Sequence, residues 1–389
     1  MDFLKPIAAS FIALSLCFNA SIKAQEDNLA KITFNGYVKN LHSIFHIKVL
    51  DDYLTDNLIH NRLNFKWYLS DHWNLSAELR NRLFYGDIIK RTAGYKNLVE
   101  RANNDFFDWS FHIIDSKGWL LNSTIDRGYI EYSRDKWEIR AGRQRVNWGI
   151  STIWNPNDVF NAFSFTDFDY EERPGSDAIR IRYFTGVASS VEIAAGMADH
   201  FEDWTGAILW KWNKWNYDFQ LLTGYVRDDW AVGGGWAGNL KTAGFKGEWT
   251  LFLPSVDSLS SSLTFTLGID YLFSNSLYFS AGYLYNSIGR TEGSLSDLFN
   301  FDISAKNLYP FRHALVVTGN YPVTPLLSGG LTWIYSPVSS HPMFINPVMT
   351  YSVATNWDLD LVGQLAFNKE GVQYTSPVWA AFMRIKLSF

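Results

Sequence analysis

Apolar and polar residues alternate along most of the chain, from about Lys31 to the carboxyl terminus. Because successive side chains of a β-strand point to opposite faces, each alternating segment predicts a strand with one apolar and one polar face. In the last segment, Trp379–Phe389, the apolar set ends on Phe389 and the other face carries Arg384 and Lys386. About eighteen segments follow this pattern, and a count of sixteen stays open. They are 31–41, 58–69, 73–85, 124–134, 136–145, 176–186, 187–198, 204–213, 215–227, 230–239, 241–250, 262–271, 276–287, 310–320, 324–336, 342–353, 357–368 and 376–389.

The links between these segments alternate in length. Links after even-numbered segments are short: 71–72, 134–136, 186–187, 213–214, 238–239, 274–275, 321–322 and 356–357. Links after odd-numbered segments include the long ones: 42–57, 86–123, 146–175, 251–261, 288–309 and 369–375. Outer-membrane barrels combine short periplasmic turns with long extracellular loops. The pattern therefore predicts an all-β fold, a transmembrane antiparallel β-barrel of about 16–18 strands with that arrangement of turns and loops.

The last strand adds a second feature of outer-membrane barrels, an aromatic residue at its end. In such barrels the apolar face of each strand meets lipid and the polar face meets the lumen. We therefore expect outer-membrane lipid around the barrel. We also expect Phe389 to act as the assembly signal for the barrel-assembly machinery.

The amino terminus reads as a secretory signal peptide. Lys5 provides a basic start, Ile7–Phe18 is an apolar run too short to span a bilayer as a helix, and small residues precede an expected cleavage after Ala24. The only cysteine, Cys17, would leave with the signal, and Leu16 before it argues against a lipid anchor. We expect residues 1–24 to be the signal peptide and residues 25–389 to form one barrel domain without a plug.

Composition narrows the class of protein further. The chain contains 17 Trp, 20 Tyr and 29 Phe, and Tyr and Trp favour membrane interfaces. Hydrophobic residues make up 47% of the chain, yet its mean hydropathy is only -0.11. No apolar run of helical-span length follows the signal, which excludes a helical membrane protein. A formal net charge of -5 argues against a general nucleic-acid binder.

Basic residues gather on the polar faces of the second to sixth segments. Neighbouring strands would bring them to one wall of the lumen, and rings of arginine and lysine select for anions. The alternative is a structural ladder in which Glu78, Glu131 and Glu138 neutralise part of the charge. Both interpretations stay open. The basic residues are Arg62, Lys66, Arg80, Arg82, Arg127, Arg140, Arg180 and Arg182.

The link 146–175 and its flanks form the second candidate region. Gly149 permits a tight turn, and Asn155-Pro156 breaks the strand pattern. We expect this loop to fold inward as a constriction, the alternative being a surface loop packed by Trp148 and Trp154. Its charged residues would then set the charge of the passage: Arg143, Arg145, Asp158, Asp169, Glu171, Glu172 and Arg173. The run 233–235 is all glycine and indicates a kink or a close backbone approach.

A resemblance to a known group of proteins starts in the same region. The pattern Gly142-Arg-Gln-x-x-x-Trp-Gly149 followed by Asn155-Pro-Asn-Asp158 looks like that of porin-like outer-membrane proteins of Bacteroidota. It is similar, more distantly, to the alginate-export type of barrel. The likeness covers about residues 141–186 and implies an outer-membrane channel. The alginate-export likeness would also imply an arginine-lined path for an acidic polysaccharide.

These observations predict an outer-membrane porin-like channel, monomeric or a homotrimer. Small hydrophilic solutes, with a preference for anionic ones, would cross it by passive diffusion. A first rival is a transporter of hydrophobic compounds, which needs an apolar lumen pocket and a lateral opening. A second rival is an outer-membrane enzyme, which needs a Ser–His pair on one rim. The eight histidines lie in no nucleophile elbow or zinc motif, so no enzymatic activity, metal or cofactor is predicted.

Overall fold

The computed structural model describes residues 31–48, 51–100, 106–162, 172–255, 260–298, 301 and 303–389. The predicted signal peptide, residues 1–24, lies outside this described part of the chain. The strands are β1 (Ile32–Ile47), β2 (Asp52–Tyr68), β3 (Trp73–Gly86), β4 (Ser110–Ser116), β5 (Trp119–Arg134), β6 (Trp137–Gln144), β7 (Ser176–Gly186), β8 (Ser189–Met197), β9 (Thr205–Lys214), β10 (Tyr217–Val226), β11 (Asp229–Leu240), β12 (Ala243–Pro254), β13 (Ser262–Leu272), β14 (Tyr278–Asn286), β15 (His313–Thr324), β16 (Leu327–Tyr335), β17 (Met343–Ala354), β18 (Trp357–Glu370) and β19 (Gln373–Ser388). Short helices are α2 (Asp87–Arg91), α3 (Tyr95–Glu100), η1 (Phe201–Asp203) and η2 (Leu295–Leu298).

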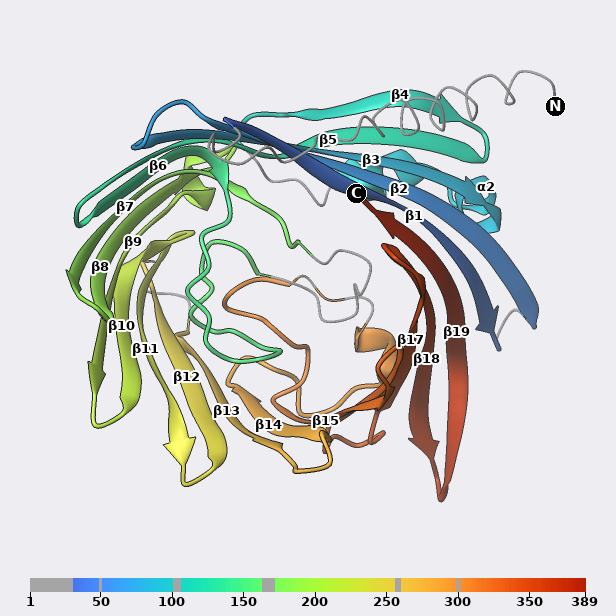
Figure 1. Ribbon diagram of the computed structural model, residues 1–389. Helices are drawn as coiled ribbons and strands as arrows, with labels where there is room; N and C mark the ends of the chain where they lie inside the picture. Colours follow the sequence, from blue (N-terminus) through green and yellow to red (C-terminus); the bar gives the residue numbers. More distant parts are fainter. Residues whose placement is uncertain are drawn as a thin grey trace.

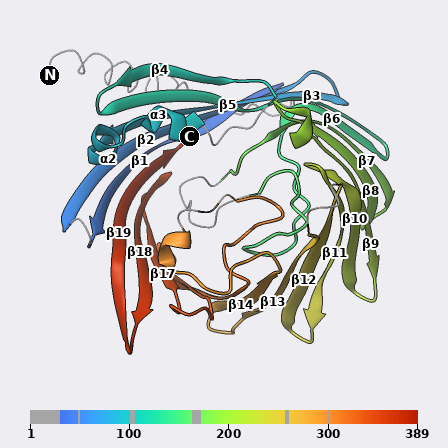
Figure 2. The same ribbon diagram turned by 180° about the vertical axis from the view of Figure 1, so that it is seen from behind.

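The strands form one closed antiparallel barrel, seen along its axis in Figure 1 and from behind in Figure 2. Apart from β4, each strand pairs with its neighbours in chain order, and β1 also pairs with β19, which closes the ring. Because β3 pairs directly with β5, the ring itself has eighteen strands, while β4 is a nineteenth strand that pairs with the first half of β5. The predicted all-β barrel of about eighteen strands is confirmed.

Tight turns join the strands at one end of the barrel, and most long links lie at the other. Trp215 and Asn216, which join β9 to β10, both have positive φ values of 56° and 61°. Two consecutive left-handed residues are the geometry of the tight hairpin turn whose twist matches that of the strands. Two predicted long links are wrong, since β1 runs to Ile47 and β18 to Glu370. The polar residues of 42–57 and 369–375 therefore largely continue the strand pairing beyond the apolar belt.

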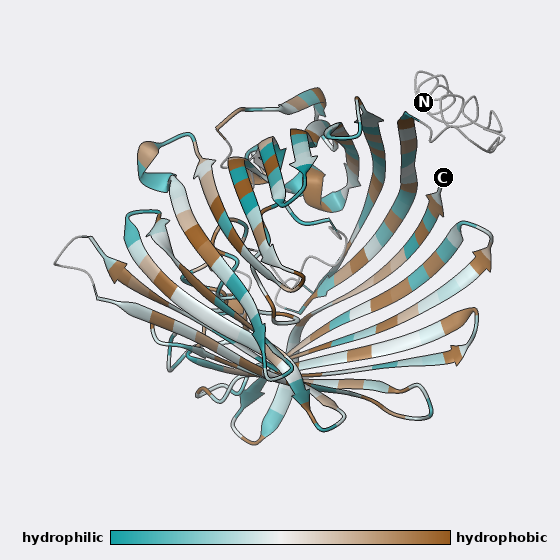
Figure 3. Ribbon diagram, turned by 60° about the vertical axis from the view of Figure 1, so that its left-hand side comes forward, coloured by the Kyte–Doolittle hydropathy of each residue, from teal (hydrophilic) through white to brown (hydrophobic). Residues whose placement is uncertain are grey.

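Strand alternation decides which side chains face the lumen. Figure 3 shows hydrophobic and hydrophilic residues alternating along the strands of the wall. In β9, Ile208 and Trp210 are exposed on the outer surface, while Leu209 between them is buried on the inside. Aromatic pairs such as Trp73–Tyr132 and Trp137–Tyr183 lie near the tight-turn end, where interfacial aromatic girdles are expected.

The carboxyl terminus is part of the seam that closes the barrel. The backbone of Phe389 both donates a hydrogen bond to Gly36 O and accepts one from Gly36 N, at 3.0 and 2.9 Å. Its ring lies 6.4 Å from that of Phe34, measured between centroids. Phe389 therefore completes the β1–β19 ladder. Across the described residues, the helices are all too short or too polar to cross a membrane.

Candidate functional site

The long link after β6 runs through the interior of the barrel rather than over its surface. Residues 145–162 cross the lumen in Figure 1. Val146, Trp148 and Val159 of this segment are almost completely buried against inward-facing side chains of β8 to β12. The ring of Trp148 packs edge-on against Phe160, with centroids 5.0 Å apart. The described part of this segment, which we call the inward loop (145–162), thus follows the course expected from the sequence.

A single buried carboxylate holds the middle of the inward loop. Glu248 on β12 is completely buried, and its Oε1 accepts hydrogen bonds from the backbone N–H groups of Ile150 and Ser151. Its Oε2 accepts a third, from Asn157 N at 3.2 Å. Hydrogen bonds to a charged acceptor are stronger than neutral ones. Glu248 therefore fixes two turns of the loop to the barrel wall.

The glycine run of β11 gives the inward loop room to approach the wall. A Cβ atom on Gly233 would lie 2.7 Å from Asn157 Oδ1 and 2.8 Å from Thr250 Oγ1. Asn157 Nδ2 donates to Gly234 O at 3.0 Å, and Thr250 Oγ1 donates to Asn157 Oδ1 at 2.8 Å. Of the two interpretations of this run, the structure shows the close backbone approach.

The described part of a second link, between β14 and β15, also lies inside the barrel. Leu295, Leu308, Tyr309 and Phe311 are buried against the inner faces of β14 to β18. Tyr309 packs edge-on against Trp154 of the inward loop, with ring centroids 5.3 Å apart. The lumen is therefore narrowed by two loops that touch each other. Sequence analysis predicted a long link here but gave no sign that it turns inward.

The basic residues of β2 and β3 meet at one buried carboxylate on β5. Arg62 donates to Asp126 Oδ2 at 2.6 Å and to Glu78, while Arg80 lies 3.0 Å from Asp126 Oδ1. Arg62, Arg80 and Asp126 form a triad that is nearly inaccessible to solvent. Their side chains are 1%, 6% and 3% exposed, respectively. The β3–β5 pairing shifts register at Asp126. This bulge turns Asp126 inward, whereas simple alternation would put it outside.

A second group of basic residues spans β6 and β7. Arg140 pairs with Glu131, Arg180 with Glu138, and Arg182 with Glu192 at 2.5 Å. Arg140 and Arg182 each keep 26% of their side chain exposed to the lumen despite these ion pairs. Glu192 also accepts a hydrogen bond from Trp148 Nε1. This second group is therefore connected directly to the inward loop.

The remaining wall residues lie near these two groups. Arg82 donates to Asn122 Oδ1 at 3.0 Å and lies over the ring of Phe84. Arg127 donates to the backbone oxygens of Glu172 and Arg173 at 3.0 and 2.7 Å, tying the end of the 146–175 link to the wall. Lys66 lies nearer the tight-turn end, 4.8 Å from the ring centroid of Tyr68. The side chain of Glu172 is 3.8 Å from Arg62. The eight predicted basic residues thus share one wall, which we call the arginine wall (β2, β3, β5, β6 and β7).

The predicted constriction residues are more dispersed. Arg143 donates twice to Asp177 at 2.9 Å and lies over the ring of Trp109. Strand alternation puts Arg143 on the opposite face from Arg140, so it belongs to the outer side of the wall, under the segment that precedes β4. Asp169 and Glu171 lie outside the described residues.

Arg145 and Asp158 of the inward loop form a loose pair in which Asp158 is buried and Arg145 is partly exposed. Arg145 NH2 lies 3.9 Å from Asp158 Oδ2. Among the described residues, Asp158 Oδ1 and Arg145 Nε find no hydrogen-bond partner. Burial raises the pKa of Asp158 to about 7, although Arg145 and Arg173 oppose the shift. Burial likewise lowers the pKa of Arg145. Asp158 is therefore a carboxyl group of the inward loop whose pKa lies near neutral.

Three carboxylates that organise the interior were missed from the sequence: Asp126, Glu192 and Glu248. Asp126 was hidden by the bulge, and Glu192 and Glu248 contact loop residues more than 40 positions away along the chain. The only sequence signal that could have placed Glu192 and Glu248 in the lumen is the alternation of side chains along β8 and β12. In the described ranges, no three His, Cys, Asp or Glu side chains are grouped to hold a metal ion.

Comparison with known proteins relates this chain to others by fold alone. No model of a known protein family matches it, and no curated protein matches its sequence. Among solved structures it is similar to OccAB4 of Acinetobacter baumannii, with a TM-score of 0.61 and 10% identity, covering 94% of this chain and 100% of that one. It is also similar to the outer membrane protein OprD of Pseudomonas aeruginosa, with a TM-score of 0.59, 10% identity and coverage of 94% and 95%. It is similar as well to OpdQ of the same organism, with a TM-score of 0.58 and 8% identity, covering 94% of this chain and 99% of that one. The chain therefore shares the fold of these barrels over nearly its whole described length.

Proposed function

We propose that this protein is an outer-membrane channel through which small hydrophilic solutes diffuse passively. Support comes from the closed eighteen-strand barrel with its apolar outer face, since barrels of this size enclose an aqueous lumen. The solved barrels to which it is similar are porin-type outer-membrane proteins. The inward loop and the β14–β15 link would serve as the size filter of this passage.

We further propose a preference for anionic solutes. The observation that carries it is the exposure of Arg140 and Arg182, which present charge to the lumen although each is ion-paired. A guanidinium has five N–H donors, and a bidentate carboxylate uses only two of them. The remaining donors can receive a passing carboxylate or phosphate. The arginine wall would then raise the local concentration of anions along the path.

Solute flux into liposomes tests this function. Proteoliposomes should swell in isotonic arabinose faster than protein-free liposomes, which establishes an open pore. Gluconate uptake should then exceed uptake of a cationic solute of similar size, such as glucosamine. Equal uptake of the two would contradict the anionic preference, and absence of swelling in every solute would contradict the channel itself.

The rival functions are less well supported by the interior. Transport of hydrophobic compounds needs a large open apolar pocket, but most apolar inner residues of β8 to β18 are covered by the two loops. We assign the chain no catalytic step and no cofactor. Its fold is shared with barrels that act as channels.

Several features of assembly remain predictions from the sequence. These are the signal peptide of residues 1–24 and the recognition of Phe389 by the barrel-assembly machinery. The likeness of residues 141–186 to barrels of Bacteroidota and of the alginate-export type also remains a proposal. A homotrimer was one expected state, but OprD-type barrels are monomeric. We therefore propose a monomer as the working unit.

A further inference from the structure

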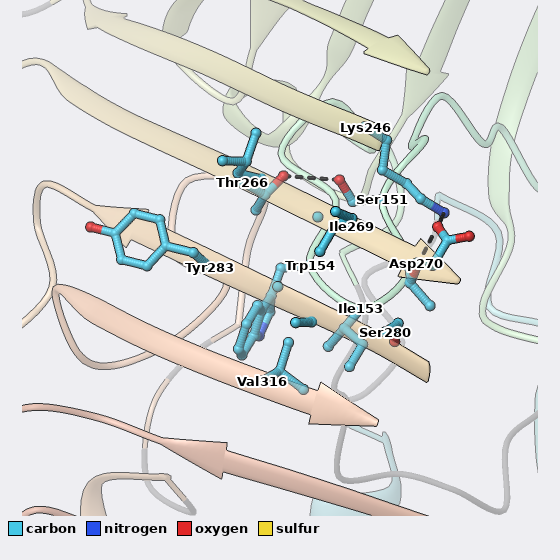
Figure 4. A pocket seen from close by; sticks show the side chains of 15 residues that line it. Ser151, Ile153, Trp154, Lys246, Thr266, Ile269, Asp270, Ser280, Tyr283 and Val316 are labelled. Carbon is cyan, nitrogen blue, oxygen red and sulfur yellow. Dashed lines mark hydrogen bonds and ion pairs between the residues drawn. The ribbon is translucent and has the colours of Figure 1, made fainter. Parts of the chain in front are cut away.

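A small pocket opens on the lumen opposite the arginine wall. It lies between the inner face of β12 to β15 and residues 151–154 of the inward loop, as Figure 4 shows. Its free volume is about 40 Å³. That is room for a few water molecules or for one edge of a larger molecule. A solute in the passage would thus meet arginine side chains on one side and this pocket on the other.

The floor of the pocket is bare backbone. Gly268 on β13 and Gly282 on β14 face the pocket without side chains. A Cβ atom added to Gly268 would find its nearest neighbour at 3.6 Å, on the flexible side chain of Lys246. The space above Gly268 is therefore unoccupied by protein atoms, and a larger side chain at this position would fill it without moving the backbone.

The rim of the pocket is polar and carries no net charge. Lys246 Nζ lies 3.1 Å from Asp270 Oδ1 and donates to Thr152 Oγ1 at 3.4 Å. Ser151 Oγ and Thr266 Oγ1 share a hydrogen bond of 2.9 Å, and both pairs are drawn in Figure 4. Each hydroxyl has one donor and two acceptor sites, so these groups can bind a further hydroxyl without losing their present partners.

The remaining lining is apolar and held in place. Ile153, Trp154 and Val316 border the pocket, and Trp154 is buried to 4% exposure. The loop side of the pocket is fixed because Glu248 binds the backbone N–H groups of Ile150 and Ser151. A fixed array of hydroxyls beside an apolar face suits a carbon chain that carries several hydroxyl groups, because C–H and O–H surfaces alternate on such a chain.

We propose that this pocket binds the hydroxyl groups of the passing solute, so that the channel selects polyhydroxylated carboxylates over plain carboxylates. The proposal rests on the anionic preference proposed above and adds a second contact to it. A passing solute would meet the arginine wall through its carboxylate and the pocket through a hydroxylated edge, as two separate contacts along the passage. Because Lys246 and Asp270 neutralise each other, the pocket recognises hydrogen-bonding groups rather than net charge.

Current block by two matched diacids tests the selection. D-glucarate and adipate have the same six-carbon skeleton and the same two carboxylates, but only glucarate carries hydroxyls. Glucarate should block single channels with a dissociation constant several-fold below that of adipate, since one extra hydrogen bond of about 1 kcal/mol corresponds to roughly fivefold. Equal block by the two diacids would overturn the proposal.

Variants locate the selection in this pocket. Gly268→Val fills the floor of the pocket and should make the dissociation constants of glucarate and adipate nearly equal. Gly206→Val is the matched control, since a Cβ there meets nothing within 4 Å and Gly206 lies on the other face of β9. Glucarate selection that survives Gly268→Val would overturn the assignment to this pocket.

A neutral probe separates this proposal from the anionic preference. Saturation-transfer NMR should detect sorbitol on the wild-type protein and not on Gly268→Val. Sorbitol binding without anion preference would contradict the proposed role of the arginine wall and leave the pocket standing. Anion preference without sorbitol binding or glucarate selection would overturn the pocket alone.

Discussion

The two halves of the barrel interior are filled by different kinds of residue. On the arginine wall, long charged side chains from neighbouring strands fill the space and pair with Asp126, Glu138 and Glu192. On the opposite half, inward positions of β8 to β12 carry small residues such as Ala194, Ala207 and Gly233, and loops fill the space instead. Strand alternation is the same on both sides. The size of the inward side chains therefore decides whether a wall stays open to solutes or receives a loop.

The halves also differ in how their contacts are made. Most ion pairs on the arginine wall join strands that are already hydrogen-bonded neighbours, and Arg62 reaches Asp126 across a single intervening strand, β3. The loop side depends on contacts between residues far apart in sequence, such as Glu248 with Ile150 and Asn157. Loss of one loop contact should therefore widen the passage. Loss of one ion pair on the arginine wall should instead change the stability of the barrel and the charge of its lumen.

The largest expected effect comes from releasing the loop. Glu248→Ala leaves three backbone N–H groups without their acceptor, which costs about 1–3 kcal/mol for each group that stays buried. The inward loop should detach, and single-channel conductance should rise well above that of the wild type. Glu202→Ala, at an exposed carboxylate of η1, is the control and should leave conductance unchanged. Unchanged conductance in Glu248→Ala would show that the loop is not held by this residue.

The next largest effect concerns stability of the arginine wall. Asp126→Ala removes the carboxylate shared by the buried Arg62 and Arg80, and breaking a buried ion pair costs about 3–5 kcal/mol. The variant should unfold at a lower temperature, measured by loss of β-sheet circular dichroism in detergent. Asp199→Ala, at an exposed loop carboxylate, should melt like the wild type. An unshifted melting curve for Asp126→Ala would contradict the structural role of the triad.

Strand number, strand order and most wall-facing residues could be predicted from the sequence because alternation is a local signal. Arg62, Arg80, Arg140, Arg180 and Arg182 all lie on the lumen face assigned to them. Alternation failed where the register shifts. The bulge at Asp126 changed its face and hid the residue that joins Arg62 to Arg80.

The loop side could be predicted only in outline. The length and residues of the 146–175 link indicated an inward course, but its anchor, Glu248, lies 91 to 98 positions further along the chain than the residues it binds. The β14–β15 link turns inward because Leu295, Tyr309 and Phe311 find apolar partners on β14 to β18. Those partners are identified only once strand faces and register are known, so sequence alone could not reveal this second loop.

A smaller effect is expected on charge selectivity. Arg140→Gln and Arg182→Gln remove charge from the exposed part of the wall. Each should lower the chloride-to-potassium permeability ratio by roughly twofold at low salt, and less at high salt because of screening. Arg134→Gln changes an exposed turn arginine and should leave the ratio as in the wild type. A selectivity that is insensitive to Arg140 and Arg182 would remove the wall from the conduction path.

The smallest effect is expected from pH. The pKa of Asp158 is raised to about 7 when the inward loop is docked, against an ordinary 3.8 for the same group in water. The docked state therefore binds the proton more tightly, and docking weakens as pH rises from about 4 to 7. Conductance should increase slightly between pH 5 and pH 8 and then level off. Asp158→Asn should abolish this dependence, and a pH dependence that persists in the variant would assign it to another group.

The reversal potential of single channels under a salt gradient tests the central claim most directly. Purified wild-type protein in a planar bilayer should give stable conductance, with a reversal potential displaced toward the equilibrium potential of chloride. That result would place the arginine wall along the path of the permeating ion. A displacement toward the potassium potential, or no conductance at all, would contradict an anion-preferring channel.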